Sequence, residues 1–165
     1  MAGFRREFDR ELEAIEAKVV ELFAMIGEDV PVATRALLSG NSEVLPVLAE
    51  REQVIDALYR EIEGLAARAI LLQAPVASDL RFLLSVLRVV PELERSHDLV
   101  MQIASRAGCI RGEDISPRCR GLVERTGELA SGMWRLAADS WYRRDRTAAS
   151  AQAGGTRRWA SSTPV

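Results

Sequence analysis

Two pairs of acidic residues repeat one spacing in different parts of the chain: Glu52 with Asp56, and Glu94 with Asp98. Residues four apart are neighbours on one face of a helix, so each pair places two carboxylates side by side. A helical hairpin that turns near residue 74 brings residue 52 about level with residue 96, so the two pairs lie opposite each other. Four carboxylates on adjacent helices are a donor set for a hard or borderline cation. These four residues are therefore a candidate metal site.

The same carboxylates also fit a solvated surface. Acidic pairs at this spacing are common on exposed helix faces, where like charges are tolerated if cations lie nearby. Four arginines are close enough in sequence to neutralise them: Arg51, Arg60, Arg88 and Arg95. The spacing alone leaves both interpretations open.

His97 is the single histidine of the chain, and its place beside Asp98 fits a packed side chain, an exposed one or a ligand. Glu94 and His97 also have the Glu-x-x-His spacing of di-iron carboxylate bundles, which need two such motifs and two further glutamates. With one histidine, only a symmetric dimer could complete that set. No Ser–His–Asp or Cys–His arrangement and no glycine-rich phosphate cradle stands out. We therefore expect a protein that is not an enzyme.

The elements that would position these residues are helices. Apolar residues recur every three or four positions over four segments, which predicts an all-α protein. The first helix begins near residue 4, is kinked at Pro31 and stops at residues 40–42 (Gly-Asn-Ser). The second has a heptad pattern that favours shallow-angle antiparallel packing, and it ends at residues 73–75. Its expected core positions are Leu48, Ile55, Leu58, Ile62, Leu65, Ala69 and Leu72.

The third helix is expected from about residue 75 to residue 104, with Glu94 and Asp98 in register with its core seam. That seam is predicted to consist of Leu80, Leu84, Leu87, Pro91 and Met101, widened by Leu83, Val86, Val90, Leu93 and Val100. Ser116 and Pro117 read as the N-cap and first residue of a fourth helix. Its apolar or small positions are Leu122, Thr126, Leu129, Met133, Leu136 and Ser140.

The composition of the chain argues against several classes of protein. Hydrophobic residues make up 48% and charged residues 28% of the 165 residues, and the net charge is −2. This balance fits a soluble globular domain and gives no case for nucleic acid as a partner. No apolar run approaches the roughly 20 residues of a membrane span, and no signal peptide is evident, so we expect a cytoplasmic protein. Cys109 and Cys119 are then expected as reduced thiols, at a spacing that excludes a CxxC zinc pair.

Three motifs resemble one family. Residues 73–81 (QAPVASDLR) are similar to the signature Q-x-P-x-A-x-D-L-R of PhoU proteins. Residues 93–98 (LERSHD) follow at the family's spacing and look like its L-E-R-x-x-D motif. Upstream, residues 52–63 (EQVIDALYREIE) match its D/E-x-x-I-D … I-E pattern. The resemblance to the PhoU family covers about residues 4–149.

The resemblance implies a fold of two three-helix repeats in a protein that acts in the cytoplasm with the phosphate-uptake ABC transporter. The implied partners are the transporter's ATPase and a phosphate-sensing histidine kinase, which is restrained when phosphate is plentiful. It also implies iron or zinc bound through E/D-x-x-x-D motifs, which correspond here to Glu52 with Asp56 and Glu94 with Asp98; manganese is a further candidate. Asp79 within the signature is either a phosphate contact, together with Arg81, or a structural residue of the third helix's first turn.

The chain departs from the family in two places. His97 stands where the family usually has a small residue. Placing Val19 on Val123 aligns the fourth segment with the first, as the start of a second repeat, but the counterparts of the first acidic pair are then Thr156 and Ala160. Neither can replace a carboxylate ligand, and the composition after Asp145 becomes rich in Arg, Ala and Ser. We expect a second repeat cut short by a frameshift or truncation.

We therefore expect three parts: residues 1–110 as a PhoU-like three-helix repeat, 111–149 as the first helix of an incomplete second repeat, and 150–165 as a disordered tail. The apolar face of a lone fourth helix must fold back onto the first bundle, pair with another chain or stay partly exposed. This predicts self-association, in the simplest case a homodimer. Three function classes remain: a metal-binding regulator of phosphate uptake and signalling, a helical interaction module without regulatory activity, and a di-iron metalloprotein.

Overall fold

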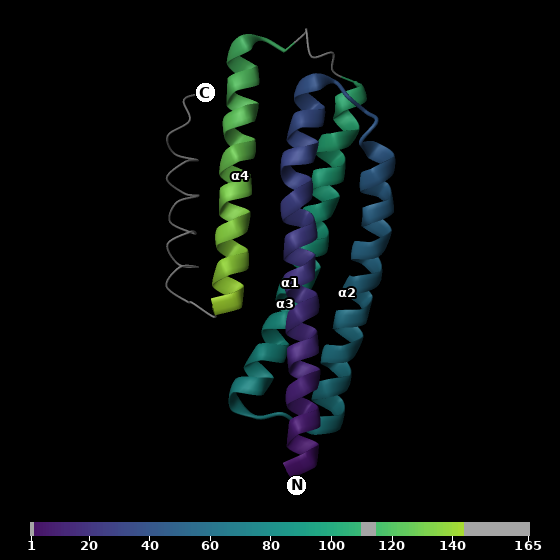
Figure 1. The fold of residues 1–165 in the computed structure, drawn as a ribbon, viewed down its shortest axis with the longest axis vertical. Coiled ribbons are helices and arrows are strands. Elements are labelled where there is room, and N and C mark those ends of the chain that lie inside the picture. The colour runs from purple at the N-terminus through teal and green to yellow at the C-terminus, as the bar shows by residue number, and fades with distance from the viewer. Residues whose placement is uncertain (1, 110–114, 144–165) are drawn as a thin grey trace.

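The structure, a computed structural model, describes residues 2–109 and 115–143, with side chains from residue 5 onwards. Four long helices account for most of these residues: α1 (Ala2–Ser39), α2 (Leu45–Gln73), α3 (Ala77–Ser105) and α4 (Pro117–Arg143), with a short 3₁₀ helix, η1 (Arg106–Gly108), after α3. They run side by side along the long axis of the molecule (Figure 1). The described residues contain no strand, so the all-α prediction is confirmed.

α1 is a single helix, and Pro31 lies inside it without ending it. Gly40 follows the helix with φ 68°, a left-handed conformation that glycine adopts without strain. The backbone N–H of Asn41 then donates to the carbonyl of Ala36 at 3.1 Å. This is the Schellman arrangement, and it confirms the predicted stop at residues 40–42.

Five of the seven core positions predicted for α2 are buried: Leu48, Ile55, Leu58, Ile62 and Ala69. The other two depart from the prediction, since Leu65 is half-buried and Leu72 is exposed. Ala66 is buried instead, because an α-helix has 3.6 residues per turn and drifts by about 20° per heptad. The prediction of Leu72 in the core is therefore wrong.

The predicted seam of α3 is also displaced. The buried residues are Leu83, Val86, Val90, Leu93, His97, Val100 and Ala104. They include all five residues that were predicted to widen the seam. The seam itself is less buried, since Leu84 is exposed and its other residues are half-buried. Both stripes have helical spacing, and contact with α1 and α2 together selects the one that includes His97. The metal candidates Glu94 and Asp98 therefore lie beside the core rather than on it, and the prediction of their register was wrong.

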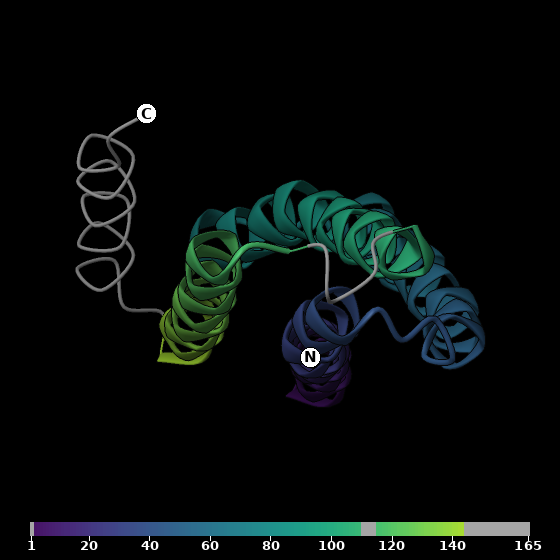
Figure 2. The ribbon, with the colours of Figure 1, turned by 90° about the horizontal axis from the view of Figure 1, so that it is seen from above.

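α1 contacts each of the other three long helices. Seen from above, α2, α3 and α4 form an arc around one side of α1 (Figure 2). Two apolar clusters form the interior. The larger includes Ile15, Leu22, Ile26, Ile55, Ile62, Leu83, Val90 and Leu93. The smaller, toward the end of α1, consists of Ala33, Leu48, Val100 and Ala104.

α4 packs against α1 of its own chain. The indole N–H of Trp134 donates to the carbonyl of Phe23 at 2.6 Å, and the two rings are 5.6 Å apart. Trp141 reaches the ring of Phe82 on α3 at 6.1 Å. The fourth helix thus folds back onto the first bundle, which is one of the three outcomes expected for its apolar face.

Ser116 precedes α4, and its hydroxyl accepts from the backbone N–H of Cys119 at 3.3 Å, which confirms the predicted N-cap. Both cysteine thiols are free and exposed. Residues 144–149 of the expected fourth segment and the expected tail, 150–165, lie outside the described residues. Within the described ranges, no helix is both long and apolar enough to cross a membrane.

Candidate functional site

The four predicted metal ligands lie on the surface between α2 and α3. Glu52 and Asp56 are half-buried on α2, Glu94 is half-buried on α3, and Asp98 is exposed one turn further along α3. We call these four residues the acidic face.

The carboxylates of the acidic face interact electrostatically with Glu94. Its pKa is raised above the usual glutamate value, first by partial burial and then by the charges of Asp98, Asp56 and Glu52, in that order. The nearby His97 opposes this shift. Both carboxylates of α2 therefore act on a residue of α3, as the antiparallel alignment predicts.

Tyr59, which was not among the predicted site residues, adds a neutral oxygen to the acidic face. The pKa of its phenol is raised by the charge of Glu63, by burial and by the charge of Glu94. Tyr59 follows Asp56 by three residues and Glu52 by seven, so helical spacing already placed it on the same side of α2. Its phenol extends the acidic face with a group that can donate or accept a hydrogen bond.

The carboxylates do not converge on one point in this structure. Within residues 2–109 and 115–143, no three His, Cys, Asp or Glu side chains are gathered closely enough to hold a metal ion. Asp56 instead accepts from Arg60 at 3.2 Å, an i, i+4 ion pair on α2. The donor chemistry fits a hard or borderline cation, because four acidic oxygen donors lie on two facing helices. A cation at Asp56 would compete with Arg60 for the carboxylate.

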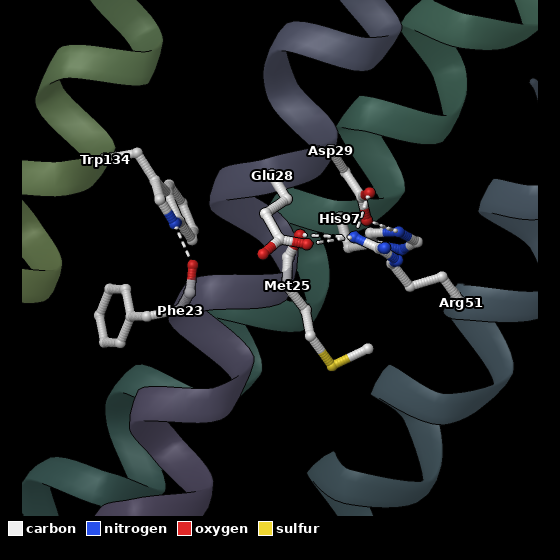
Figure 3. A network of polar contacts seen from close by, with 7 residues as sticks. All are labelled: Phe23, Met25, Glu28, Asp29, Arg51, His97 and Trp134. Atoms are coloured by element: carbon white, nitrogen blue, oxygen red, sulfur yellow. Dashed lines mark hydrogen bonds and ion pairs between the residues drawn. The ribbon is translucent and has the colours of Figure 1, made fainter.

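A buried polar layer lies where α1, α2 and α3 meet (Figure 3). Asp29 of α1 is 2% exposed and His97 of α3 is 1% exposed. Nη1 of Arg51 donates to Asp29 Oδ1 at 2.8 Å, and it also lies 3.1 Å from Glu28 Oε2. On the other side, His97 Nε2 is 3.3 Å from Asp29 Oδ2, within ion-pairing distance but not aligned as a hydrogen bond.

This layer joins the three helices that carry or support the acidic face. Arg51 is the residue before Glu52, and His97 is the residue before Asp98. The layer therefore fixes the axial position of α2 relative to α3 near the acidic face. The side chain of His97 is used inside the bundle, against Asp29. Asp29 was not among the predicted functional residues, although the stripe Ile26, Asp29, Ala33 places it on the apolar face of α1.

Asp79 lies in the first turn of α3 and forms an ion pair with Arg5 of α1 at 3.0 Å. Its position favours the structural role among the two considered, since a carboxylate stabilises the N-terminus of a helix. Arg81 is exposed on the other side of the same turn.

Together these features define an all-α protein with an antiparallel three-helix unit, a fourth helix on its first helix, and an acidic face over its second and third. The family model described as the PhoU domain matches residues 19–107. The chain belongs to the PhoU domain family.

Several curated relatives match a longer part of the chain than the family model does. A "phosphate-specific transport system accessory protein PhoU homolog" of Synechocystis sp. is 36% identical over 103 residues, which are 62% of this chain and 46% of the relative. A homolog of the same description from Zymomonas mobilis is 30% identical over 140 residues, 85% of this chain and 59% of the relative. The chain thus spans about half the length of the curated relatives it matches.

The crystal structure of PhoU from Pseudomonas aeruginosa is similar in three dimensions, with a TM-score of 0.81 and 28% identity. The match covers 87% of this chain and 69% of that one. It therefore extends beyond the three-helix unit, and the resemblance inferred from three short motifs is confirmed for the family and the fold.

Proposed function

We propose that this chain is a cytoplasmic regulator of phosphate uptake and of the response to phosphate starvation. The observation that carries this proposal is the family match over residues 19–107, which spans most of α1, all of α2 and α3, and the acidic face. The curated relatives are named as accessory proteins of phosphate-specific transport systems. In this proposal, the chain binds the ATPase of a phosphate ABC transporter and a phosphate-sensing histidine kinase.

We further propose that the acidic face holds iron, zinc or manganese through Glu52, Asp56, Glu94 and Asp98. The raised pKa of Glu94 supports this, because partial burial and three neighbouring carboxylates leave negative charge uncompensated there. A bound cation would supply the missing positive charge. The polar layer beneath would keep α2 and α3 at the height that places the two pairs opposite each other.

Metal content measured by mass spectrometry tests the site. The variant Glu94→Ala/Asp98→Ala removes one pair from the acidic face. Glu124→Ala/Glu128→Ala is a matched control, since it removes an exposed pair of the same spacing from α4. We expect near-stoichiometric metal in the unaltered protein and in the control, and loss of metal in the first variant. Absence of metal in every sample after reconstitution would refute the site.

Binding to the transporter ATPase tests the regulatory role. A pull-down with the ATPase, and a second with the kinase's cytoplasmic part, should each retain the chain. If neither retains it, the helical interaction module without regulatory activity becomes the better interpretation. An oxygen-dependent absorbance change on iron loading would instead favour the di-iron alternative.

Self-association is a separate proposal. Leu122 and Leu136 of α4 remain more than half exposed although the helix packs on α1. Such residues give a second copy an apolar surface. Static light scattering should show a dimer whose fraction rises with protein concentration, and a monomer at all concentrations would contradict it.

A further inference from the structure

The outer face of α3 carries a regular row of arginines and leucines. Arg81, Leu84, Arg88, Arg95 and Leu99 are all exposed, with Leu84 at 44% and Leu99 at 54%. We call these five residues the arginine stripe. By helical spacing it lies opposite the buried residues of α3. Since α1 lies on the inner side of the arc that α2, α3 and α4 form (Figure 2), the stripe faces away from α1.

The three arginines of the stripe have no anionic partner among residues 2–109 and 115–143. Other arginines of the chain do: Arg5 pairs with Asp79, and Arg51 pairs with Asp29. Arg81, Arg88 and Arg95 form no ion pair with any described carboxylate. The stripe therefore presents three positive charges that an external partner can neutralise.

The spacing of the stripe matches a helix. Its arginines are seven residues apart, which is about 10.5 Å along the axis at a rise of 1.5 Å per residue. Seven residues is the repeat at which two helices packed at a shallow angle meet again. Leu84 lies between Arg81 and Arg88, and Leu99 lies one turn beyond Arg95, so the two leucines supply apolar contacts beside the charges.

We propose that the arginine stripe docks an amphipathic helix of a partner protein, with acidic side chains at seven-residue spacing beside an apolar seam. This inference rests on the proposed function, in which the chain acts by binding partner proteins. It assigns the docking surface to the outer side of α3, beside the acidic face.

An anionic membrane fits this surface less well. A helix that lies in a membrane buries a continuous apolar face in the lipid, whereas the stripe offers two leucines that are about half exposed. Glu92 and Asp98 are exposed along its two edges, and an anionic lipid surface would repel them. A partner helix can place neutral or basic side chains opposite these two positions.

Charge reversal tests the stripe directly. The stripe variant is Arg81→Glu/Arg88→Glu/Arg95→Glu. Its control, Arg68→Glu/Arg118→Glu/Arg135→Glu, makes the same change in net charge at exposed arginines of α2 and α4. Circular dichroism and thermal unfolding establish that both variants fold. Affinity is measured for the transporter ATPase, the kinase's cytoplasmic part, a synthetic helix with Glu at seven-residue spacing and Leu between, and phosphatidylglycerol vesicles.

We expect the unaltered protein and the control to bind the acidic synthetic helix and at least one of the two proteins. The stripe variant should bind them at least about tenfold more weakly, because close opposite charges become like charges. A synthetic helix with Lys in place of Glu should not bind.

The outcomes separate the inference from the proposed function. If a partner protein binds the unaltered protein and the stripe variant equally, the docking surface is wrong and the function stands. If neither protein binds but the synthetic helix does so through the stripe, the proposed partners are wrong and the docking chemistry stands. Binding of neither protein nor synthetic helix overturns both, and stripe-dependent binding of vesicles without helix binding replaces the protein partner with a membrane.

Discussion

The guanidinium of Arg51 on α2 lies 2.8 Å from the carboxylate of Asp29 on α1, whose side chain is 2% exposed. His97 of α3 closes the layer from the other side, at 3.3 Å. The layer separates the two apolar clusters, since it lies between Ile26 and Ala33 of α1. Asp29 and His97 thus interrupt the apolar interior between α1, α2 and α3, at the axial position where α2 and α3 carry the acidic face.

Replacing Arg51 with alanine should destabilise the fold strongly. Asp29 would be left buried without its main partner, and breaking a buried pair in this way costs about 3 kcal/mol. Urea unfolding gives the free energy of unfolding. Glu28→Ala is the control, because Glu28 is exposed and is the second acceptor of the same Arg51 Nη1, so its loss should change stability by less than about 1 kcal/mol. Equal effects of the two substitutions on the free energy of unfolding would show that the buried pair of Arg51 and Asp29 stabilises the fold no more than the exposed pair with Glu28 does.

The contact between α1 and α4 should depend on a glycine. A Cβ added to Gly127 would lie 2.5 Å from Thr34 Cγ2 and 3.1 Å from Thr34 Cβ, so helix α4 would have to move away from α1. We expect Gly127→Ala to cost about 1–3 kcal/mol, as overpacking usually does. Hydrogen exchange of α4 amides and tryptophan fluorescence during unfolding would report the loosened helix.

Gly132 provides the opposite case on the same helix. Nothing lies within 4 Å of a Cβ added there. Alanine should therefore stabilise α4 by up to about 1 kcal/mol, the usual difference between the two residues in a helix interior. If Gly127→Ala stabilised the protein as much as Gly132→Ala, the close packing of α4 on α1 would be refuted.

The sequence predicted the elements well where the determinants are local. The stop after Ser39 depends on Gly40, and the start of α4 depends on Ser116 and Pro117; both were predicted from residue type alone. The face of α3 that would be buried was not predictable in the same way. Two apolar stripes on α3 satisfy the helical period, and only the positions of α1 and α2 decide between them.

The polar layer of Asp29, Arg51 and His97 was not predicted from the sequence, for a related reason. Asp29 and His97 are 68 positions apart in the sequence, and each is individually consistent with an exposed residue. Their pairing results from helix packing, which periodicity does not report. The opposition of the two acidic pairs was predictable, since it needs only an antiparallel hairpin with a known turn, and the pKa shift of Glu94 agrees with it.

Asp79 offers a test between its two considered roles. Asp79→Asn should lower the free energy of unfolding by about 1 kcal/mol, because it removes a helix-terminus charge and the ion pair with Arg5. Asp139→Asn, at an exposed position of α4, should change it by less than about 0.5 kcal/mol. In calorimetry with inorganic phosphate, we expect Asp79→Asn and Arg81→Ala to leave the heats unchanged. A phosphate response lost in both variants would instead support the phosphate contact.

Glu94 should make stability fall as pH rises. Partial burial, followed by the charges of Asp98, Asp56 and Glu52, raises its pKa in the folded state, so the folded protein binds this proton more tightly than the unfolded chain does. The free energy of unfolding then decreases as pH rises from the ordinary glutamate pKa to the raised one. Glu94→Gln carries no charge and should escape this decrease. In the presence of EDTA, we expect it to be more stable than the unaltered protein at neutral pH.

The stability difference between Glu94→Gln and the unaltered protein has an expected size and an expected sign. A like-charge pair on a helix costs about 0.2–0.5 kcal/mol, and three carboxylates act on Glu94, so the gain should be about 1 kcal/mol at neutral pH. Below the ordinary glutamate pKa of about 4.3, the difference should vanish, because the carboxylate is protonated in both states. Urea unfolding across this pH range measures the stability difference, with Glu50→Gln on the exposed side of α2 as the control.

Saturating manganese or zinc should reverse the order of stability, because a cation held by the acidic face stabilises only the protein that keeps Glu94. A glutamine variant that is less stable in EDTA would show that the carboxylates are not in electrostatic conflict.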